Sequence, residues 1–412
     1  MATVIGGGVT TYINVGSNDA NGLGQQLANT ISNGLQAAPP TYIRTNGPAP
    51  TGALGVLTVS TPNSTTYEQP GVTVALVNGN NAAVANDSVI VASSGGTGQA
   101  LLGDNENITF FTANGAGTVV AGDGNDIIGT PRTGNANFNI TTGNGNDTII
   151  AATGTNTVHA GGGANYIFTG NANDTVYSSG SNDVICGVGS SAGTTDTVYQ
   201  TGGPVLVGSF AKNLVFIGDS STATIVGGSG SDTITGGTGA LVAAGGTAGN
   251  NVISGGTGSV GSTLFGGGNG DVLTALGSGT NLLVAGAGNE TLTGANSTGN
   301  NYFFASQASH AVMTGGPGND VYFVGAGAST VNGGSGGSDI VAIVDGRAGG
   351  TVVLNNFQAG AQTIELQGYG ANELTNDLAN QEAVNGSAVI TLSDNTTITF
   401  TGIAHVNSNA FS

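Results

Sequence analysis

A degenerate nonapeptide recurs from about residue 115 to residue 345, and its fullest copies are Gly227-Gly228-Ser229-Gly230-Ser231-Asp232-Thr233-Ile234 and Gly315-Gly316-Pro317-Gly318-Asn319-Asp320-Val321-Tyr322. Its pattern is Gly-Gly-x-Gly-x-Asp/Asn-x-aliphatic-x. A fixed short period is the sequence signature of a repeat architecture, in which each copy packs on the next. The repeat therefore indicates the fold before any residue is considered for chemistry.

The spacing of the polar sixth position supports this interpretation. In one stretch it recurs every nine residues, on Asp147, Asn156, Asn165, Asp174 and Asp183. An aliphatic residue follows each of them two places later, at Ile149, Val158, Ile167, Val176 and Ile185. A second, less regular run comprises Asp271, Asn281, Glu290, Asn301, Asp320 and Asp339. A low-complexity Gly/Asn/Thr tract could imitate parts of this pattern, but it would not hold an apolar residue in register.

The length of the repeat predicts how the chain winds. Nine residues make one short strand and one tight turn, so two repeats complete one circuit of a flattened parallel coil. Glycines supply the positive φ angles and the close backbone approach that the turns need. The aliphatic residue points inward and stacks on its equivalent one circuit away. The sequence therefore predicts an all-β fold, a parallel β-roll or β-solenoid of nonapeptide repeats.

These repeats resemble those of the RTX (hemolysin-type calcium-binding) family, whose fold is the parallel β-roll. The resemblance implies that the sixth-position acids bind Ca²⁺ between adjacent turns, together with backbone carbonyls of the turns. This agrees with the preference of Ca²⁺ for six to eight hard oxygen ligands in flexible geometry. Carried over by position, the candidate ligands are Asp126, Asp147, Asp174, Asp183, Asp232, Asp271, Glu290, Asp320 and Asp339.

The acidic positions are not evenly filled. The acids expected to pair across one circuit are Asp126 with Asp147, Asp271 with Glu290, and Asp320 with Asp339. Asp174, Asp183 and Asp232 also match the motif, but we expect Asn or a small residue as their next partner on the same edge. Many other sixth positions are Asn, Ser or Thr, and an amide can cap a turn by hydrogen bonding. An Asn-capped solenoid with little bound metal therefore remains an alternative.

Composition excludes several classes of function. The chain has 412 residues, of which 77 are Gly and none is Trp, and only 7% are charged. Its formal net charge is -19 with four Lys and Arg residues, which disfavours nucleic acid and anionic membrane surfaces as partners. No stretch approaches the length of a membrane-spanning apolar helix, so we expect no membrane insertion. The aliphatic periodicity and a hydrophobic fraction of 38% argue against disorder.

Catalytic motifs find little support. His159, His310 and His405 are far apart in the sequence, and none lies in an H-E-x-x-H zinc motif. The segment Gly333-Gly334-Ser335-Gly336-Gly337 formally matches a G-x-S-x-G elbow, but no strand–elbow–helix context surrounds it. The sequence therefore predicts that the protein is not an enzyme.

Residues 1–100 differ in composition from the repeats and are predicted to form an N-terminal region with one helix and short strands. Apolar residues at i+4 spacing predict a helix over about residues 17–38, at Leu23, Leu27, Ile31 and Leu35. Asp19 or Asn21 is the candidate N-cap, and Pro39-Pro40 ends the helix. Such a helix either lies on the end of its own solenoid as a cap or contacts a neighbouring subunit, and the sequence leaves both open.

Residues 101–345 are then the roll, and residues 346–412 are a C-terminal β cap. Segments 352–357 and 364–370 resemble the region that closes many RTX proteins exported by the type I route. Residues 389–400 alternate in polarity around Asp394-Asn395, which predicts a β-hairpin. We expect this region to protect the open end of the roll and to carry an uncleaved secretion signal. Residues 1–8 lack the basic and apolar parts of a cleavable signal peptide, which also favours the type I route.

The predicted function follows from the surface of such a solenoid, rich in Thr, Asn and Ser and poor in charge. We predict a secreted extracellular structural protein that self-assembles, as a homo-oligomer or polymer, into a surface layer or matrix fibre, with folding aided by Ca²⁺. The alternative is a calcium-dependent adhesin or surface-binding module for a cell-surface glycan, another cell or ice. Regular Thr columns would favour the alternative, but along the sequence Thr is scattered among Asn, Gly and Ser.

Overall fold

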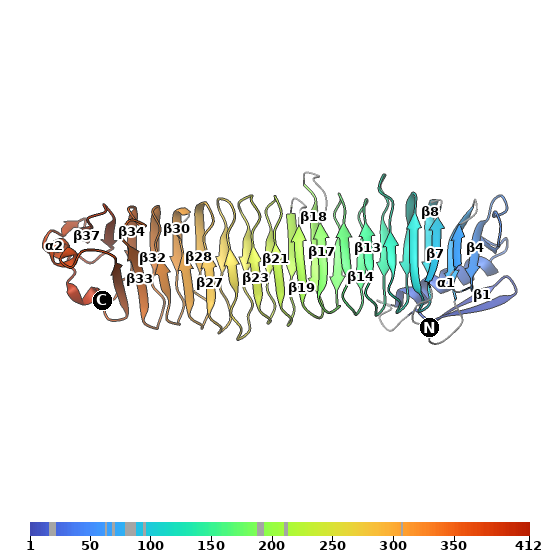
Figure 1. The fold of residues 1–412 in the computed structure, drawn as a ribbon, viewed down its shortest axis with the longest axis horizontal. Helices are drawn as coiled ribbons and strands as arrows, with labels where there is room; N and C mark the ends of the chain where they lie inside the picture. Colours follow the sequence, from blue (N-terminus) through green and yellow to red (C-terminus); the bar gives the residue numbers. More distant parts are fainter. Residues whose placement is uncertain are drawn as a thin grey trace. The chain divides into compact units, whose positions relative to one another are not determined.

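The computed structural model describes residues 1–15, 22–61, 64–67, 71–78, 88–93, 96–187, 193–209, 213–305 and 308–412. The chain forms two compact units, Met1–Lys212 and Asn213–Ser412, and each is a parallel β-solenoid (Figure 1). Within each unit the strands alternate between two sheets, so every circuit adds one strand to each. We call these the even sheet and the odd sheet, after the numbers of most of their strands. The predicted fold class is confirmed.

The first unit begins with the hairpin β1 (Ala2–Gly6) and β2 (Val9–Ile13) and helix α1 (Leu23–Gln36). Its even sheet contains β3 (Tyr42–Arg44), β4 (Leu54–Val59), β6 (Val72–Val77), β8 (Gly96–Leu102), β10 (Gly115–Val120), β12 (Phe138–Thr141), β14 (Thr157–Ala160), β16 (Thr175–Ser178) and β18 (Thr195–Gln200). Its odd sheet contains β5 (Ser64–Tyr67), β7 (Ser88–Ser93), β9 (Asn107–Thr112), β11 (Ile127–Gly129), β13 (Thr148–Ala151), β15 (Tyr166–Thr169), β17 (Asp183–Gly187) and β19 (Val205–Ser209).

The second unit repeats this plan. Its even sheet contains β20 (Asn213–Ile217), β22 (Thr233–Thr235), β24 (Val252–Ser254), β26 (Val272–Thr274), β28 (Gly288–Thr293), β30 (Ala308–Thr314), β32 (Ala328–Asn332), β34 (Thr351–Asn355), β38 (Thr397–Phe400), β37 (Ser387–Thr391) and β36 (Glu382–Val384). Its odd sheet contains β21 (Ala223–Val226), β23 (Leu241–Ala244), β25 (Thr263–Phe265), β27 (Asn281–Val284), β29 (Asn301–Phe304), β31 (Val321–Phe323), β33 (Asp339–Val344) and β35 (Gln362–Gln367). Helix α2 (Glu373–Ala379) and a 3-10 turn (Ser408–Ala410) follow.

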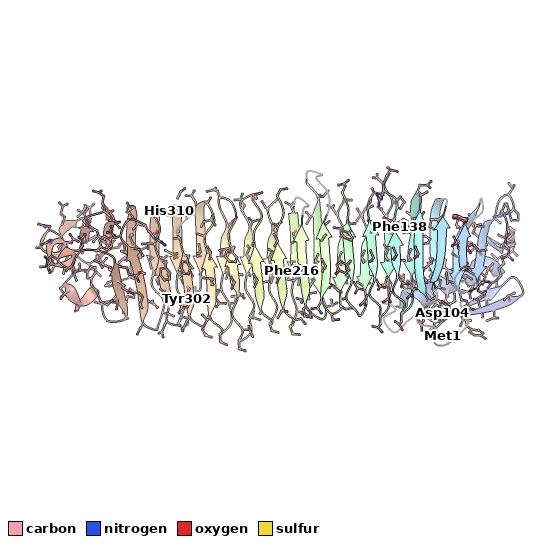
Figure 2. The ribbon with its side chains drawn as sticks, viewed as in Figure 1. Met1, Asp104, Phe138, Phe216, Tyr302 and His310 are labelled. Atoms are coloured by element: carbon pink, nitrogen blue, oxygen red, sulfur yellow. The ribbon has the colours of Figure 1, made fainter. Side chains whose placement is uncertain are left out.

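The interior of each unit is filled by inward side chains, which stack on the equivalent side chains of the next circuit. Ile149, Ile167 and Ile185 are buried and pair in register from β13 through β15 to β17, as the sequence predicts. Larger side chains fill the same space elsewhere, such as Phe138 in the first unit and Phe216 in the second (Figure 2). Because successive side chains of a strand point to opposite faces, the residues between these positions face outward.

Glycine at the turns is required by the close approach of successive circuits. At Gly145 a Cβ atom would collide with the carbonyl oxygen of Gly124, one circuit earlier. Gly163 lies in the left-handed region at φ 92°, which L side chains rarely adopt. The repeat glycines therefore serve both the turn geometry and the stacking of turns.

Parallel pairing extends beyond the expected limits of the roll at residues 101 and 345. Strands β4, β6 and β8 already pair in parallel before residue 101, and β34 and β35 pair with the preceding circuit after residue 345. These circuits lack the Gly-rich nonapeptide, but they keep inward apolar residues such as Ala75 and Ile364. Stacking of apolar residues is therefore sufficient to continue the solenoid where the turn motif is absent.

The N-terminal helix covers the flank of its own unit. Residues 16–21, with the candidate caps Asp19 and Asn21, lie outside the described residues. Helix α1 and the β1–β2 hairpin share a buried apolar cluster with the outward face of the even sheet, and its members include Ile31, Val74, Leu76 and Leu102. Of the two interpretations, packing on its own chain is the one observed, but on a sheet face rather than on the solenoid end. Among the described residues, no helix has the length and apolarity needed to cross a membrane.

The C-terminal hairpin is present where the sequence predicts it. Strands β37 and β38 pair antiparallel, and the Thr396 N–H donates to the Asp394 carboxylate at 2.9 Å in the turn. Strand β38 pairs in parallel with β34, so the hairpin continues the even sheet and changes its direction. On the odd sheet, the Ser412 N–H donates to the Ile364 carbonyl of β35 at 3.0 Å. At this end of the unit, the hairpin therefore covers β34 of the even sheet, and residues near the C-terminus contact β35, the last strand of the odd sheet.

The outward faces of the two sheets differ in chemistry. On the even sheet, Thr stands in columns that pair in register, Thr157–Thr175–Thr197 in the first unit and Thr235–Ser254–Thr274–Thr293–Thr314 in the second. This corrects the expectation of scattered Thr, which arose because circuits of unequal length hide the columns in the linear sequence. The odd sheet instead presents apolar residues outward, including Tyr166 and Leu206 in the first unit.

Two adjacent residues of β15 test the stacking of the interior. Ile167 is 0% exposed and Tyr166 is 53% exposed. Ile167→Ala is expected to lower the free energy of unfolding by about 2–5 kcal/mol, because it opens a cavity between two circuits. Tyr166→Ala, which removes a larger side chain from the surface, is expected to change it by much less. Urea or thermal unfolding of the two variants measures the difference, and equal losses would contradict the inward–outward assignment.

Candidate calcium sites at the turns

The sixth-position acids all point into the solenoid. Each of the nine predicted ligand residues is at most 2% exposed. They form columns, in which each residue lies beside its equivalent one circuit away. In the first unit, the odd column is Asp126, Asp147, Asn165 and Asp183, and the even column is Asn156, Asp174 and Asp196. In the second unit, the even column is Asp232, Asn251, Asp271 and Glu290, and the odd column is Ser262, Asn281, Asn301, Asp320 and Asp339.

One kind of hydrogen bond recurs at most steps of the columns. One side-chain oxygen accepts the backbone N–H of the residue one circuit earlier, as from Asp126 to Asp147 Oδ1 at 2.8 Å and from Asp320 to Asp339 Oδ1 at 3.0 Å. That N–H is buried, and it lies at the corner where the chain enters a strand. A buried N–H without an acceptor would cost about 1–3 kcal/mol, so the column supplies an acceptor where the turn lacks one.

The columns bring together the three acidic pairs that the sequence predicts and add a fourth. Asp174 meets Asp196, to which its N–H donates at 3.2 Å, rather than an Asn or a small residue. Asp196 is buried and also accepts the Thr169 hydroxyl at 2.8 Å. The repeat pattern does not identify it, because no Gly-Gly-x-Gly motif precedes it in the sequence. The available signal was Val198, the buried aliphatic residue two places after it.

Steps from an amide to an acid are satisfied by the chain itself. The Asn165 side-chain amide donates to Asp183 Oδ1 at 2.9 Å, and Asn301 donates to Asp320 in the same way at 2.7 Å. The second carboxylate oxygen accepts a glycine N–H of its own turn, as Asp320 Oδ2 does from Gly316 at 2.7 Å. These carboxylates therefore have neutral donors around them.

At an acid–acid step neither side chain can donate when both are ionised, so donors of the turn decide whether the oxygens are satisfied. Glycine N–H groups satisfy Asp320 Oδ2 and Asp339 Oδ2, whereas some oxygens at the other acid–acid steps lack a well-formed bond of this kind. Asp126 Oδ2 is buried and has no hydrogen-bond partner. Asp147 Oδ2 makes no hydrogen bond of good geometry, although the Thr142 hydroxyl beside it favours the ionised form. Both carboxylate oxygens of Glu290, next to Asp271, are also buried without a well-formed hydrogen bond, although the backbone N–H groups of Asp271, Gly286 and Gly270 beside them favour the ionised form. Hard, unsatisfied oxygen atoms of this kind fit a divalent cation.

Burial raises the pKa of acids at both kinds of step, including Asp183 and Asp232, which follow or precede an amide. Burial and then the charge of Asp147 raise the pKa of Asp126 well above its usual value. Burial raises the pKa of Asp147 and of Asp196 to about 6. Burial and then the charge of Asp271 raise the pKa of Glu290 to about 7. A bound cation would favour the ionised form of each of these groups.

Ligands other than side chains are needed to complete such a site. Within the described ranges, no three His, Cys, Asp or Glu side chains lie close enough together to hold a metal ion by themselves. Two carboxylates from one acid–acid step must therefore be joined by backbone carbonyls, which Ca²⁺ accepts readily and which the turns present in each circuit.

The motifs examined for catalysis belong to the solenoid. Gly333–Gly337 forms the turn before Asp339, and the Gly334 N–H donates to Asp339 Oδ2 at 3.1 Å. The His159 ring stacks on Tyr177 at 4.4 Å on the outward face of the even sheet, and burial lowers its pKa.

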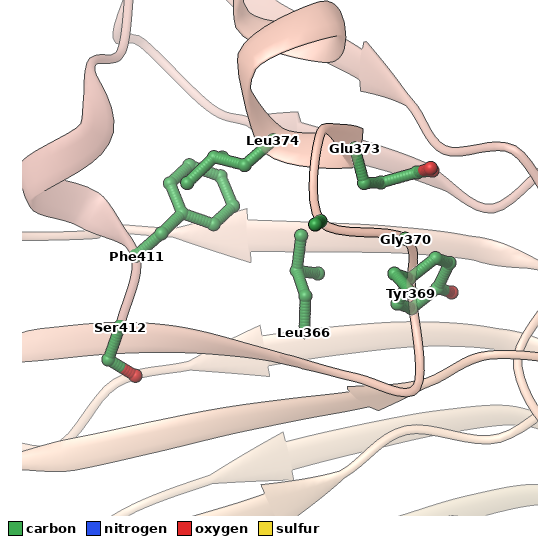
Figure 3. A pocket seen from close by; sticks show the side chains of 8 residues that line it. Leu366, Tyr369, Gly370, Glu373, Leu374, Phe411 and Ser412 are labelled. Atoms are coloured by element: carbon green, nitrogen blue, oxygen red, sulfur yellow. The ribbon is translucent and has the colours of Figure 1, made fainter.

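A pocket of about 150 Å³ near the C-terminus is lined by Leu366, Tyr369, Leu374 and Phe411 among others, with Leu374 against the Phe411 ring (Figure 3).

Comparison with known families agrees with this geometry. The model of the RTX calcium-binding nonapeptide repeat matches residues 141–176, 159–187, 217–240, 276–304 and 314–339. These segments contain seven of the nine predicted ligands and lie in both units. The matched repeats are calcium-binding repeats, and they indicate that the chain binds Ca²⁺. No curated protein matches the chain.

One substitution at two places in the same column separates the two kinds of step. Asp126→Asn turns an acid–acid step into an amide–acid step, and is expected to raise the free energy of unfolding in chelator by roughly 1 kcal/mol. Asp183→Asn is expected to lower it by about 1–3 kcal/mol, because Asp183 Oδ2 accepts the Ser178 hydroxyl and the Gly180 N–H. Denaturation in chelator gives both values.

Calcium titration tests whether Asp126 is a ligand. Asp126→Asn is expected to bind fewer calcium ions per chain in equilibrium dialysis and to gain less stability from added calcium. Asp345→Asn, an equal charge change at an exposed residue outside the columns, is the control. A calcium count that Asp126→Asn leaves unchanged would remove Asp126 from the ligands.

The raised pKa values also predict how stability depends on pH. The folded state holds the protons of Asp126 and Asp147 more tightly than the unfolded chain does, with Asp123 and Asp183 adding negative charge around them. The contribution of Asp147 to stability is therefore full below about pH 4 and is lost as pH rises through about 6, and that of Asp126 is lost in the same direction. In chelator, the free energy of unfolding is expected to fall over this range. Added calcium should reduce the fall, and a fall of the same size with calcium would contradict a role for these groups in binding.

Proposed function

Because the chain carries RTX calcium-binding repeats in both of its units, we propose that it is a secreted extracellular structural protein whose copies assemble into a surface layer or matrix fibre. RTX repeats are typical of extracellular calcium-binding proteins, and roll domains of this kind are typically non-catalytic. On this proposal the protein is not an enzyme, and calcium bound at the acid–acid steps aids its folding.

The observation that carries the proposal is the absence of charge from the sheet faces. From β9 to β33 in the odd sheets and from β10 to β34 in the even sheets, no described outward residue is Asp, Glu, Lys or Arg. Between β9 and β34, the acids that the structure describes lie in the columns or in the turns. Flat faces with short Thr and Val side chains lose little conformational entropy when they pack, which favours contact between copies.

The route out of the cell is part of the same proposal. We assign the type I route to residues 346–412, whose segments at 352–357 and 364–370 resemble the ends of exported RTX proteins. The β37–β38 hairpin and the contact of Ser412 with β35 support the role of this region as a cap. The secretion signal and the cap are assigned to the same residues, 346–412. Export of a reporter protein fused to these residues would test the secretion role by itself.

Electron microscopy with and without calcium tests the proposed assembly. Purified protein in millimolar calcium is expected to form ordered sheets or fibres, and the same protein in chelator is expected to lose them together with part of its β signal in circular dichroism. A folded, calcium-loaded protein that stays monomeric at every concentration would contradict self-assembly.

The Thr columns favour a second candidate function. Hydroxyl and methyl groups repeat along the even sheet at the spacing of strands, about 4.8 Å, in both units. Such a face suits a calcium-dependent surface-binding module whose partner is itself periodic, such as a polysaccharide or ice. A monomer that binds one of these in calcium, and loses binding when Thr274 and Thr293 are changed to Lys, would support this function instead.

A further inference from the structure

The odd sheet of the second unit has an exposed apolar surface, which we call the apolar face and define as the outward side chains of β21 to β33. Its most exposed members are Val226 at 52%, Val242 at 44%, Tyr302 at 39% and Phe265 at 37%. The face spans seven strands, and it ends at β35, where the outward residue Glu365 brings the first charge. Thr224 and Thr263 interrupt the face, but it carries no charge, and an uncharged, largely apolar surface of this kind is a candidate interaction surface.

The apolar side chains are ordered in straight columns. Tyr302 pairs in register with Val321, and Phe304 pairs with Phe323, whose ring stacks on it at 4.4 Å and 10°. The columns run across the strands, and their side chains repeat at the strand spacing of about 4.8 Å. A surface with the same repeat matches them best, and a second copy of this chain supplies one.

The charge of the chain points to the same partner. Two copies that each carry a net charge of -19 repel one another wherever their turns or C-terminal regions meet. The apolar face carries no Asp, Glu, Lys or Arg, so contact there buries no like charges. Two sheets packed face to face at about 10 Å are the usual arrangement for uncharged sheet faces in β-sandwiches.

The area of the face sets the strength of the contact. Seven strands span roughly 30 Å, and three residues of a strand span about 10 Å. Two such faces cover on the order of 600 Å², which is less than the 1,200 Å² or more of a stable pairwise interface. The contact is therefore weak for one pair of units. The odd sheet of the first unit has its own exposed apolar residues, Tyr166 and Leu206, so each chain offers a surface of this kind in both units.

We propose that the apolar face of the second unit is the surface through which two copies of this chain pack, odd sheet against odd sheet. This rests on the proposed self-assembly and names the surface that carries it. The even sheet, with its Thr columns, is left free on the opposite side of the unit.

Two valines provide a matched test. Val242 on β23 belongs to the apolar face, and Val252 on β24 is equally exposed, at 43%, on the even sheet of the same unit. Val242→Glu is expected to weaken self-association by at least roughly tenfold, because it places an unpaired charge in the contact. Val252→Glu, with the same charge change, is expected to associate like the parent chain. Sedimentation velocity over a concentration series in calcium measures both, and circular dichroism with the calcium-induced thermal shift confirms that both variants are folded.

The other outcomes overturn the inference in different ways. Equal association of both variants and the parent would reject the apolar face as the contact and leave self-assembly standing. A greater loss with Val252→Glu would place the contact on the even sheet. A parent chain that remains monomeric would reject both the contact and the proposed function. If that monomer bound phosphatidylcholine vesicles and Val242→Glu did not, the face would belong to a lipid surface rather than to a second copy.

Discussion

The hydrogen bond from a buried backbone N–H to a side-chain oxygen of the next circuit is the interaction on which the rest of the structure depends. Sheet partners satisfy the N–H groups within the strands, but at the corner before each strand the direction of the chain removes that partner. Asn156, Asn165 and Asp232 each supply the missing acceptor from their own circuit. Because the acceptor must be short and must reach the same N–H each time, Asp or Asn is required almost everywhere, and the strands are thereby held in register.

Asn and Asp side chains both provide that acceptor, but they differ in the hydrogen-bond partners and the charge compensation that they require. An Asn adds two N–H donors, which reach the turn carbonyls or the carboxylate of the next rung, as Asn156 reaches Asp174 at 2.9 Å. An Asp adds a negative charge in a place that water does not enter. Where an Asn precedes an Asp, the amide donates to the carboxylate. Where two acids follow one another, the glycine N–H groups and hydroxyls of the turn satisfy some carboxylates, as at Asp320 and Asp339, and leave others unpaired, as at Asp126. The order of the residue types and the donors of each turn together decide which turns fit calcium.

Much of this could be predicted from the sequence, because local spacing and local chemistry determine it. The inward Ile149 and Ile167, and the pairing of Asp126 with Asp147, follow from counting residues around a circuit. Features that depend on the pairing of circuits of unequal length could not be predicted. Asp196 joins Asp174 across twenty-two residues, and the Thr columns become visible only when strands are placed side by side. The extension of the solenoid before residue 101 was missed because Val74 and Leu76 are covered on the outward side by α1, which removes the alternation of a half-exposed strand.

The circuits are also units of growth. Asp147, Asn165 and Asp183 follow one another at eighteen residues, and each rung contacts only the rungs before and after it. Loss of residues 148–165 would bring Asp183 next to Asp147 and leave every other rung unchanged, and duplication of the same stretch would add one rung. Chain length can therefore change in whole circuits during evolution without a new fold having to be found. Each circuit gained or lost also adds or removes one strand from each outward face. The number of repeats therefore determines how much surface is available to a partner.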